Sequence, residues 1–274
     1  MTESRHGVPP LEYCGLKIAR AREHRDTLAK YVADTFAVEA NRLRARTRFE
    51  PDSSESILYV SYMPDLSKFL SQCSIILGDA LYALRSALDH LAYQLAFLDT
   101  GGKIQDPCRI QFPICDTPSA FTKEEKDRLK EVDPAHIKII ETFQEYPGVG
   151  TDRPLSELRK LSNQEKHRLP IDIVVPLSSL EGVTHPQTSA AFVFGAVQQF
   201  LQTGSPIVFE RAKLGAVIMR RKVPSAPPPD EETTCYVASN IAFDGDRLVF
   251  DALDKIVATV EDVIRAFEPV FRQA

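Results

Sequence analysis

The most prominent pattern in the sequence is a stripe of apolar residues, mostly leucine, between positions 66 and 98. Its members recur at steps of three and four, the spacing of one face of a helix. They are Leu66, Leu70, Cys73, Leu77, Leu81, Leu84, Leu88, Leu91, Leu95 and Leu98. At about 1.5 Å per residue, such a helix would span roughly 50 Å. Gly101 and Gly102 follow, as expected at a helix C-terminus. The sequence therefore predicts one long central helix with a buried side.

The period of the pattern changes ahead of this helix. Residues 12–40 predict a helix, whereas residues 42–49 alternate between arginine and less polar residues. The arginines are Arg42, Arg44, Arg46 and Arg48. Alternation with period two is typical of a strand with one solvated face. A polar turn at 51–56 leads to a run of β-forming residues at 57–62, so the sequence predicts a β-hairpin at about 42–62.

The second half of the chain is richer in β-forming residues. Short helices are expected at 118–130 and 134–145, and another begins at Pro154. Six later runs predict strands of a mostly antiparallel sheet, at 171–175, 190–194, 207–210, 216–220, 234–238 and 247–250. A clean apolar stripe from Asp251 to Phe267 predicts a C-terminal helix, which covers this sheet or returns to the helical half.

Together these elements predict an α+β fold. Residues 1–170 are expected to form a mainly helical region with one long central helix and the inserted hairpin. Residues 171–274 are expected to form a mostly antiparallel β-sheet half closed by the C-terminal helix, in one compact unit. A chain of 274 residues is long enough to bury a substantial core.

Charge and composition restrict the partners and the compartment. The formal net charge is −5, so any contact with nucleic acid needs a local basic patch. The five cysteines complete no zinc pattern, which indicates reduced thiols. The first twenty residues contain no run of signal-peptide type, and charges interrupt the apolar stretch at 66–98. We therefore predict a cytoplasmic protein with no membrane partner and no cofactor.

The first candidate site is the polar cluster Arg85–His90 within the long helix. His90 would act as general acid or base, because the pKa of imidazole lies near neutrality. Arg85 would hold a phosphate and oppose the charge of the transition state. Attack by a ribose 2′-hydroxyl needs no metal, so this interpretation predicts cleavage of RNA. In the alternative, Arg85 and Asp89, four residues apart, form an ion pair on the solvated side of the helix, and His90 is a hydrogen-bonded flanking residue.

The second candidate site is the run of six polar residues from Asn163 to Arg168. Asn163 and His167 are four apart and share a helix face, so His167 would join the histidine of the first cluster in one cleft. In the alternative, Lys166 and Arg168 bond the last carbonyls of the helix and favour its dipole. No metal site is predicted, because the two clusters contain no pair of histidines four apart.

The third candidate site is the arginine strand at 42–49. Its guanidinium groups, beside Tyr59 and Tyr62 of the partner strand, would hold a phosphate backbone and stack bases. The alternative is an edge strand that its charges protect from aggregation.

Three segments carry a resemblance to known proteins: Arg85-Ser-Ala-Leu-Asp-His-Leu-Ala92, Phe112-Pro-Ile114 and Asn163-Gln-Glu-Lys-His-Arg168. They resemble a family of bacterial proteins without an assigned activity. More distantly, Arg85 and His90 are similar to the signature of the HEPN superfamily, in which Asn, Asp or His usually follows the arginine. Those are α-helical domains, many of them ribonucleases that work as dimers. The resemblance implies that Arg85 contacts phosphate, that His90 is the acid or base, and that the chain forms a homodimer.

Two hypotheses of different classes follow from these observations. In the first, the chain is an RNA-acting, HEPN-like, metal-independent ribonuclease. Its catalytic residues are Arg85, His90 and His167, and the other polar side chains of both clusters, with the arginine strand, bind RNA. In the second, it is a non-enzymatic ligand-binding or protein-interaction module in which the clusters are structural. The sequence leaves open which of the two is correct.

Overall fold

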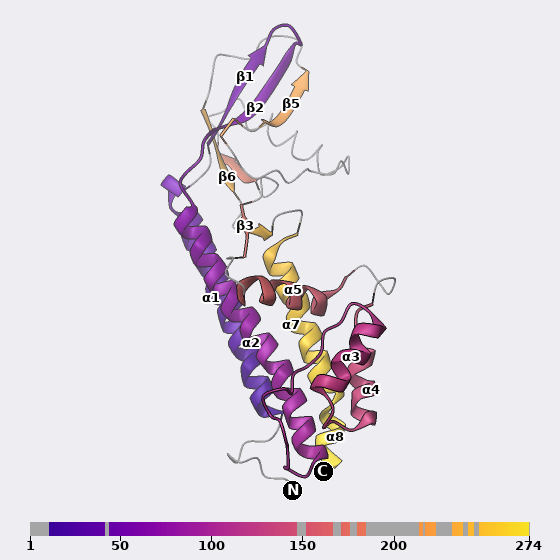
Figure 1. Ribbon diagram of the computed structural model, residues 1–274. Coiled ribbons are helices and arrows are strands. Elements are labelled where there is room, and N and C mark those ends of the chain that lie inside the picture. The colour runs from indigo at the N-terminus through magenta and orange to yellow at the C-terminus, as the bar shows by residue number, and fades with distance from the viewer. Residues whose placement is uncertain are drawn as a thin grey trace. The chain divides into compact units, whose positions relative to one another are not determined.

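The computed structural model describes residues 11–41, 44–146, 152–166, 171–175, 180–184, 214–215, 217–222, 232–237, 241–243 and 247–273 (Figure 1). The chain divides into two compact units. Unit 1 comprises Met1–Thr27, Ile75–Ile171 and Phe250–Ala274, and unit 2 comprises Leu28–Ser74 and Asp172–Val249. The described strands all belong to unit 2. The protein is therefore mostly helical with a small antiparallel sheet, in agreement with the predicted α+β class.

The predicted long helix is confirmed as α2, which runs for 33 residues from Ser67 to Asp99. Its stripe of leucines is buried from Leu77 to Leu95, whereas Leu70 and Leu98 near the two ends are half-buried. Asp65 caps the N-terminus, because its Oδ1 accepts a hydrogen bond from the Ser67 backbone N–H at 3.0 Å. This bond lowers the pKa of the Asp65 carboxyl below its ordinary value. Neither α2 nor any other helix in the described ranges is long and apolar enough to cross a membrane.

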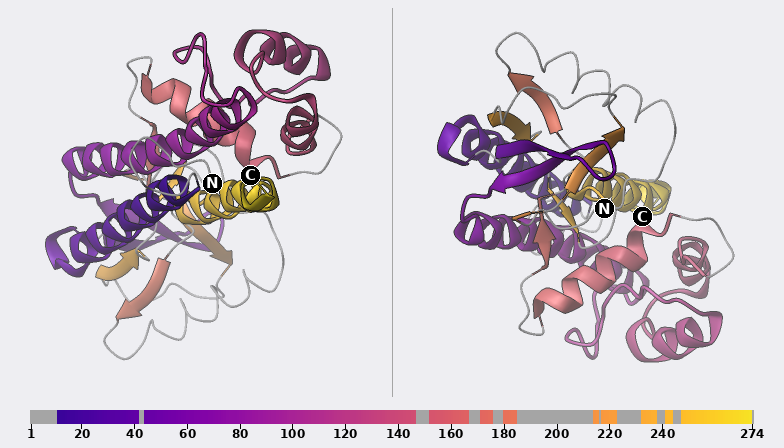
Figure 2. Two further views of the ribbon diagram at one scale, coloured as in Figure 1. Left: turned by 90° about the horizontal axis from the view of Figure 1, so that it is seen from below. Right: turned by 90° about the horizontal axis from the view of Figure 1, so that it is seen from above.

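Unit 1 contains the part of α1 (Glu12–Ala37) up to Thr27 and the larger part of α2. These two segments run side by side and antiparallel (Figure 2), since Tyr13 near the start of α1 stacks on His90 towards the end of α2. The other helices of unit 1 are α3 (Pro118–Arg128), α4 (Pro134–Thr142), α5 (Pro154–Lys166), α7 (Val249–Ala266) and α8 (Glu268–Gln273). α3, α4 and α5 each begin with proline, which suits the first turn because that position needs no backbone N–H.

The C-terminal helix α7 groups with the helices of unit 1 from Phe250 onward. Arg25 of α1 donates hydrogen bonds to both carboxylate oxygens of Asp254, at 3.0 and 2.9 Å, and lies over the ring of Phe250. The apolar stripe of α7 is buried as predicted. Closure of the sheet by this helix is not shown. The sequence left two placements open for this helix, over the sheet or in the helical half. From Phe250 onward α7 lies among the helices of unit 1.

Unit 2 contains a five-stranded antiparallel sheet in the order β4-β6-β1-β2-β5. Its strands are β1 (Arg44–Glu50), β2 (Glu55–Tyr62), β4 (Leu180–Thr184), β5 (Val217–Lys222) and β6 (Glu232–Val237). β1 and β2 form the predicted hairpin. A second sheet pairs β3 (Ile173–Val174) with β7 (Ala242–Phe243), and a short 3-10 helix, η1, covers Glu39–Asn41. The hairpin therefore belongs with the later strands, whereas the sequence placed it in the helical region.

The later strands correct the sequence prediction at three places, one of which is the two-residue strand β7, which was not predicted. The strand expected at 247–250 is wrong, because Val249 already begins α7 and only Leu248 bridges to Ala242. The apolar run there has the right composition for a strand but continues directly into the 3.6-residue period of α7. Strand β4 was missed, since its sequence does not alternate. The strands expected at 190–194 and 207–210 lie outside the described residues.

The end of α2 depends on two glycines in the left-handed region. Gly101 and Gly102 have φ of +61° and +83°, and the Gly102 N–H donates to the Phe97 carbonyl at 2.7 Å. A Cβ on Gly102 would also meet the Phe97 ring at 3.1 Å, whereas one on Gly101 would meet nothing within 4 Å.

We predict that Gly102→Ala lowers the free energy of unfolding by about 1–2 kcal/mol, because the left-handed backbone conformation destabilises residues other than glycine by about that amount. Gly101→Ala should cost less, since it adds strain without a ring contact. Gly15→Ala, inside α1 with open space around the new Cβ, serves as control and should stabilise by about 0.5–1 kcal/mol. Urea unfolding measures all three. Equal effects at 15 and 102 would contradict the prediction.

Candidate functional site

Arg85 and Asp89 hold the backbone of Phe112 against α2. Arg85 donates to Asp89 from Nε at 3.2 Å and from Nη2 at 2.9 Å, and Nη2 also donates to the Phe112 carbonyl at 2.6 Å. Asp89 Oδ1 accepts a hydrogen bond from the Phe112 N–H at 3.0 Å. The Arg85 side chain is only 14% exposed. The predicted ion pair is therefore confirmed, but it is half-buried and acts as a fixed clamp on a passing chain segment instead of lying on the solvated side of the helix.

A second side chain fixes the same segment from another direction. Gln144, which follows α4, accepts from the Cys115 N–H at 2.9 Å and donates to the Pro113 carbonyl at 3.0 Å. Its amide also donates to the Ile140 carbonyl at 3.1 Å, which orients it. The segment Phe112–Cys115 thus has its backbone bound by side chains from α2 and from the end of α4. We call it the clamped segment.

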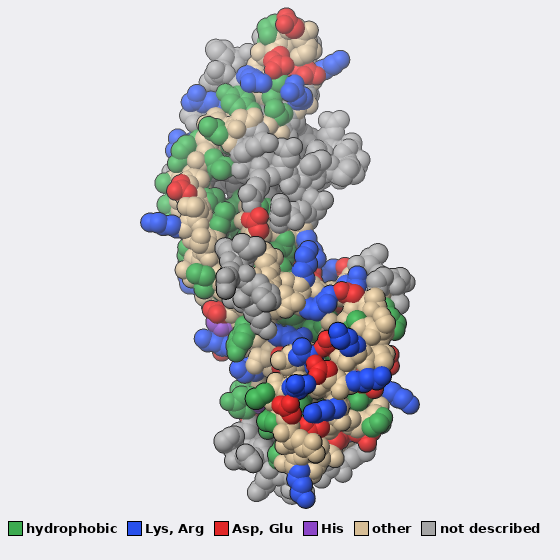
Figure 3. Space-filling model, viewed as in Figure 1, with side chains coloured by type: hydrophobic (Ala, Val, Ile, Leu, Met, Phe, Trp, Pro, Cys, Tyr) green, Lys and Arg blue, Asp and Glu red, His purple; other side chains and the backbone are tan. Residues whose placement is uncertain are grey.

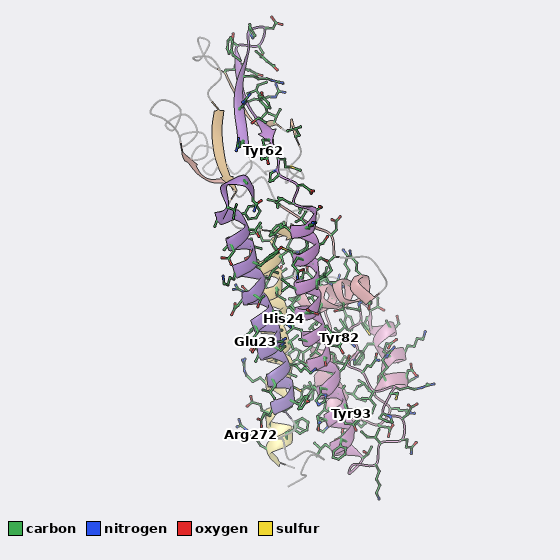
Figure 4. The ribbon with its side chains drawn as sticks, turned by 90° about the vertical axis from the view of Figure 1, so that its left-hand side faces the viewer. Glu23, His24, Tyr62, Tyr82, Tyr93 and Arg272 are labelled. Carbon is green, nitrogen blue, oxygen red and sulfur yellow. The ribbon has the colours of Figure 1, made fainter. Side chains whose placement is uncertain are left out.

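His90 lies in a different environment. Its ring stacks on Tyr13 of α1 with centroids 4.9 Å apart, and Tyr93, labelled in Figure 4, lies 6.4 Å away. Burial, and secondly the charge of Lys17, lower the pKa of His90 below its ordinary value. Arg85 faces the clamped segment and His90 faces α1, so the structure does not bring these two predicted catalytic residues together.

The second predicted cluster is described only in part. Asn163 lies on α5, is exposed and lines a pocket. Lys166 is the last residue of α5. His167 and Arg168 lie outside the described residues, so the expected meeting of His167 with His90 has no structural description.

A pocket of about 290 Å³ lies within unit 1, between the clamped segment, α2, α3 and α5. Three arginines from three helices line it: Arg85, Arg128 and Arg159. Arg128 forms an ion pair with Glu124 and donates to Gln111, and Arg159 forms one with Asp116. Figure 3 shows Lys, Arg, Asp and Glu side chains gathered over α3, α4 and α5. Sequence analysis did not single out Arg128 or Arg159.

Two buried polar atoms at this pocket have no hydrogen-bond partner among the described residues: Arg159 Nε and Ser162 Oγ. Ser162 is only 5% exposed. It stands four residues after Leu158 and seven after Leu155, which places a hydroxyl in the apolar stripe of α5. A polar residue at such a position was the sequence signal for this site.

The arginine strand β1 lies in the middle of its sheet, between β6 and β2. The alternative of a charged, protected edge strand is therefore wrong. Arg44 lies over the ring of Tyr62 at 5.2 Å and Arg48 over the ring of Tyr59 at 5.4 Å. Both distances are typical of cation–π contacts. Arg42 lies outside the described residues.

A β-bulge puts both tyrosines on the arginine face. Tyr59 and Tyr62 are three apart, so regular alternation would send them to opposite faces. The register shifts between Arg44 and Ala45, so that Arg44 pairs with Tyr62 while Arg46 pairs with Tyr59. The extra residue, Ser61, restores the phase. We call the resulting surface, formed by Arg44, Arg46, Arg48, Tyr59 and Tyr62, the arginine–tyrosine face.

Neighbouring charges modify this face. Arg220 of β5 pairs across from Ile57 and so points to the same side. Glu50 forms ion pairs with Arg48 at 3.2 Å and with Arg220 at 3.7 Å, and Glu55 pairs with Arg220 at 3.4 Å. These pairs are exposed, so solvent and salt screen them and they add little stability.

Comparisons of the chain with protein-family models, curated proteins and solved structures found no match. Within the described residues, no group of three or more His, Cys, Asp or Glu side chains is placed to hold a metal ion.

We predict that Asp89→Ala lowers the free energy of unfolding by about 1–3 kcal/mol, because it removes a charged hydrogen bond to the Phe112 N–H and leaves Arg85 without its carboxylate. Asp79→Ala, at an exposed position of the same helix, is the matched control and should change stability little. Chemical denaturation compares the two. Similar small effects of both substitutions would show that the clamp contributes nothing.

The lowered pKa of His90 predicts a pH dependence of stability. The folded state favours the neutral imidazole, so this contribution is complete above the ordinary pKa of 6.5 and is lost as the pH falls through the lower folded-state pKa. His90→Phe keeps a ring against Tyr13 but cannot be protonated. Its melting temperature should therefore fall less than that of the wild type between about pH 7.5 and about pH 5. Parallel declines in the two proteins would contradict this.

Proposed function

We propose that this protein binds single-stranded RNA on the arginine–tyrosine face and does not cleave it. The observation that carries the proposal is the pair of arginine–tyrosine stacks on two hydrogen-bonded strands, Arg44 on Tyr62 and Arg48 on Tyr59, each with one exposed and one half-buried member. Proteins that hold single strands combine a cationic groove for the backbone with aromatic rings for the bases. The stacks supply both chemistries on one surface.

The spacing of the face supports this role. Alternate residues of a strand repeat about every 6.8 Å, so the arginines of β1 form a regular series of positive groups. Arg46 and Arg48 are exposed, and Tyr62 is 41% exposed. Because β1 is paired on both sides, its backbone is not available for another strand, and the face itself remains the surface on which a partner binds.

The environments of the first cluster favour the non-enzymatic hypothesis over the ribonuclease. Arg85 Nε and Nη2 are engaged by Asp89 and Phe112, and His90 stacks on Tyr13. Phosphate capture by Arg85 would compete with the clamp. The arginine–tyrosine face therefore carries the proposal without a catalytic step. A cytoplasmic location remains part of the proposal, and a homodimer is not required for it.

The binding test measures fluorescence anisotropy of a labelled oligouridylate over a series of salt concentrations. Replacing Arg44, Arg46 and Arg48 by Gln should weaken binding and lower the slope of log affinity against log salt by about 2, since each phosphate contact to a single strand contributes about 0.7. Tyr59→Ala combined with Tyr62→Ala should weaken binding with little change in that slope, because stacking releases no counterions.

The charge-matched control replaces Arg20, Arg22 and Arg265 by Gln. These are exposed, ion-paired arginines of unit 1. Circular dichroism checks that each variant keeps its sheet. Equal loss of binding in the two triple variants, or no binding by the wild type, would reject the proposal.

Cleavage is tested separately by following the integrity of the RNA on a denaturing gel. Wild type and His90→Ala should leave the same fraction of RNA intact, with or without a chelator. Loss of RNA that depends on His90 would restore the ribonuclease hypothesis.

A further inference from the structure

We infer that the pocket in unit 1 binds a small organic anion. Arg128, Arg159 and Ser162 receive its oxyanion group, and the clamped segment contacts its apolar body. The site lies wholly in unit 1 and shares no residue with the arginine–tyrosine face, so it stands independently of the RNA proposal.

Two buried donors at the pocket have no hydrogen-bond partner among the described residues. Arg159 Nε–H is a donor only, and the Ser162 hydroxyl also has a proton to give. Neither has a hydrogen-bond partner among the described residues, although both atoms are buried at the pocket. Buried polar groups normally have a partner, because leaving one unpaired destabilises the folded state. The two residues are three apart on α5, on one face, so a single acceptor group can serve both.

The arginines around the pocket outnumber the carboxylates that pair with them. Asp116 accepts from both Arg153 and Arg159, so one carboxylate serves two guanidinium groups. Arg128 has Glu124, and Arg85 has Asp89. Four arginines thus share three carboxylates, and the incomplete pairing falls at Arg159. A guanidinium group binds carboxylate and phosphate preferentially, because its fork matches their geometry.

The size and lining of the pocket suit a small organic anion. About 290 Å³ is at the lower end for small-molecule pockets, which run from roughly 300 Å³ upward. A water molecule occupies about 30 Å³ of liquid, so an inorganic ion alone would leave most of the space empty. The other wall is the clamped segment, where Phe112 and Ile114 are buried. The ligand therefore needs an apolar part as well as an oxyanion.

One wall of the pocket is held in place before any ligand binds. The clamped segment is fixed by Arg85, Asp89 and Gln144 through its backbone. A wall that is already ordered loses little conformational entropy when a ligand binds. The clamp thus explains why residues far apart in the sequence converge on this pocket.

Calorimetry on the full chain tests the ligand class with benzoate, phenyl phosphate, inorganic phosphate and benzyl alcohol. The two organic anions should bind saturably, inorganic phosphate should bind more weakly than phenyl phosphate, and benzyl alcohol should not bind. The tighter of benzoate and phenyl phosphate identifies a carboxylate or a phosphate ester as the natural group, and either order supports the inference. Absence of saturable anion binding, or equal binding of benzyl alcohol and benzoate, overturns it.

Arg159→Gln and Arg153→Gln form a matched pair, because both remove one arginine from Asp116 but only Arg159 lines the pocket. The change at 159 should weaken binding of the better anion about tenfold or more, which is the loss of one charged hydrogen bond. The change at 153 should alter it less than about threefold. Equal weakening by both would assign the effect to general charge and overturn the site.

Ser162→Ala separates binding from folding. It should weaken anion binding several-fold while leaving the unfolding free energy of the unliganded protein unchanged or higher, because it removes a buried hydroxyl that has no described partner. Reduced stability with unchanged anion affinity would mean that the hydroxyl serves the fold, and would remove Ser162 from the site.

Discussion

The hydrogen bonds of Arg85 and Asp89 to the Phe112 backbone determine how the chain of unit 1 is arranged around α2. They join positions 23 and 27 residues apart in sequence through side-chain contacts to one peptide. The chain leaving α2 is thereby brought back against the same helix, and α3 and α5 can approach it to form the pocket. Removing one partner of a partly buried ion pair leaves the other charge without its partner in a poorly solvated place, so this pair favours one arrangement of the fold.

Elements with a long, regular period were readable from the sequence alone. The 33-residue helix α2, the hairpin of β1 with β2, and the buried stripe of α7 were all predicted, because each repeats its period over many residues. The pairing of strands that are distant in the sequence could not be predicted in this way. Nothing local in β1 says that it pairs with β6, so the hairpin was assigned to the helical region. At residues 247–250, three apolar positions were too few to separate a strand from a helix start.

In the candidate sites, too, local patterns were predicted from the sequence, whereas contacts between distant segments were not. The sequence drew attention to Arg85, Asp89 and His90 as one group, since they are close along the chain. Their chemistry differs because a helix turns neighbouring residues to different surroundings: Phe112 for the first two, Tyr13 for the third. Conversely, Arg128 and Arg159 come from different helices, and only the fold makes them neighbours. The spacing of residues along a helix predicts which of them share a face. It does not predict which other segment of the chain packs against that face.

The bulge at Ser61 has a consequence for how related chains should be compared. Deleting this one residue would place the two tyrosines two apart, so that regular alternation alone would keep Tyr62 opposite Arg44 and on the same face as Tyr59. A homologue with the same composition but a two-residue interval between its tyrosines would need no insertion to achieve the same stacks. Related hairpins should therefore be aligned by the face of the sheet on which each side chain lies, and not by the number of identical residues.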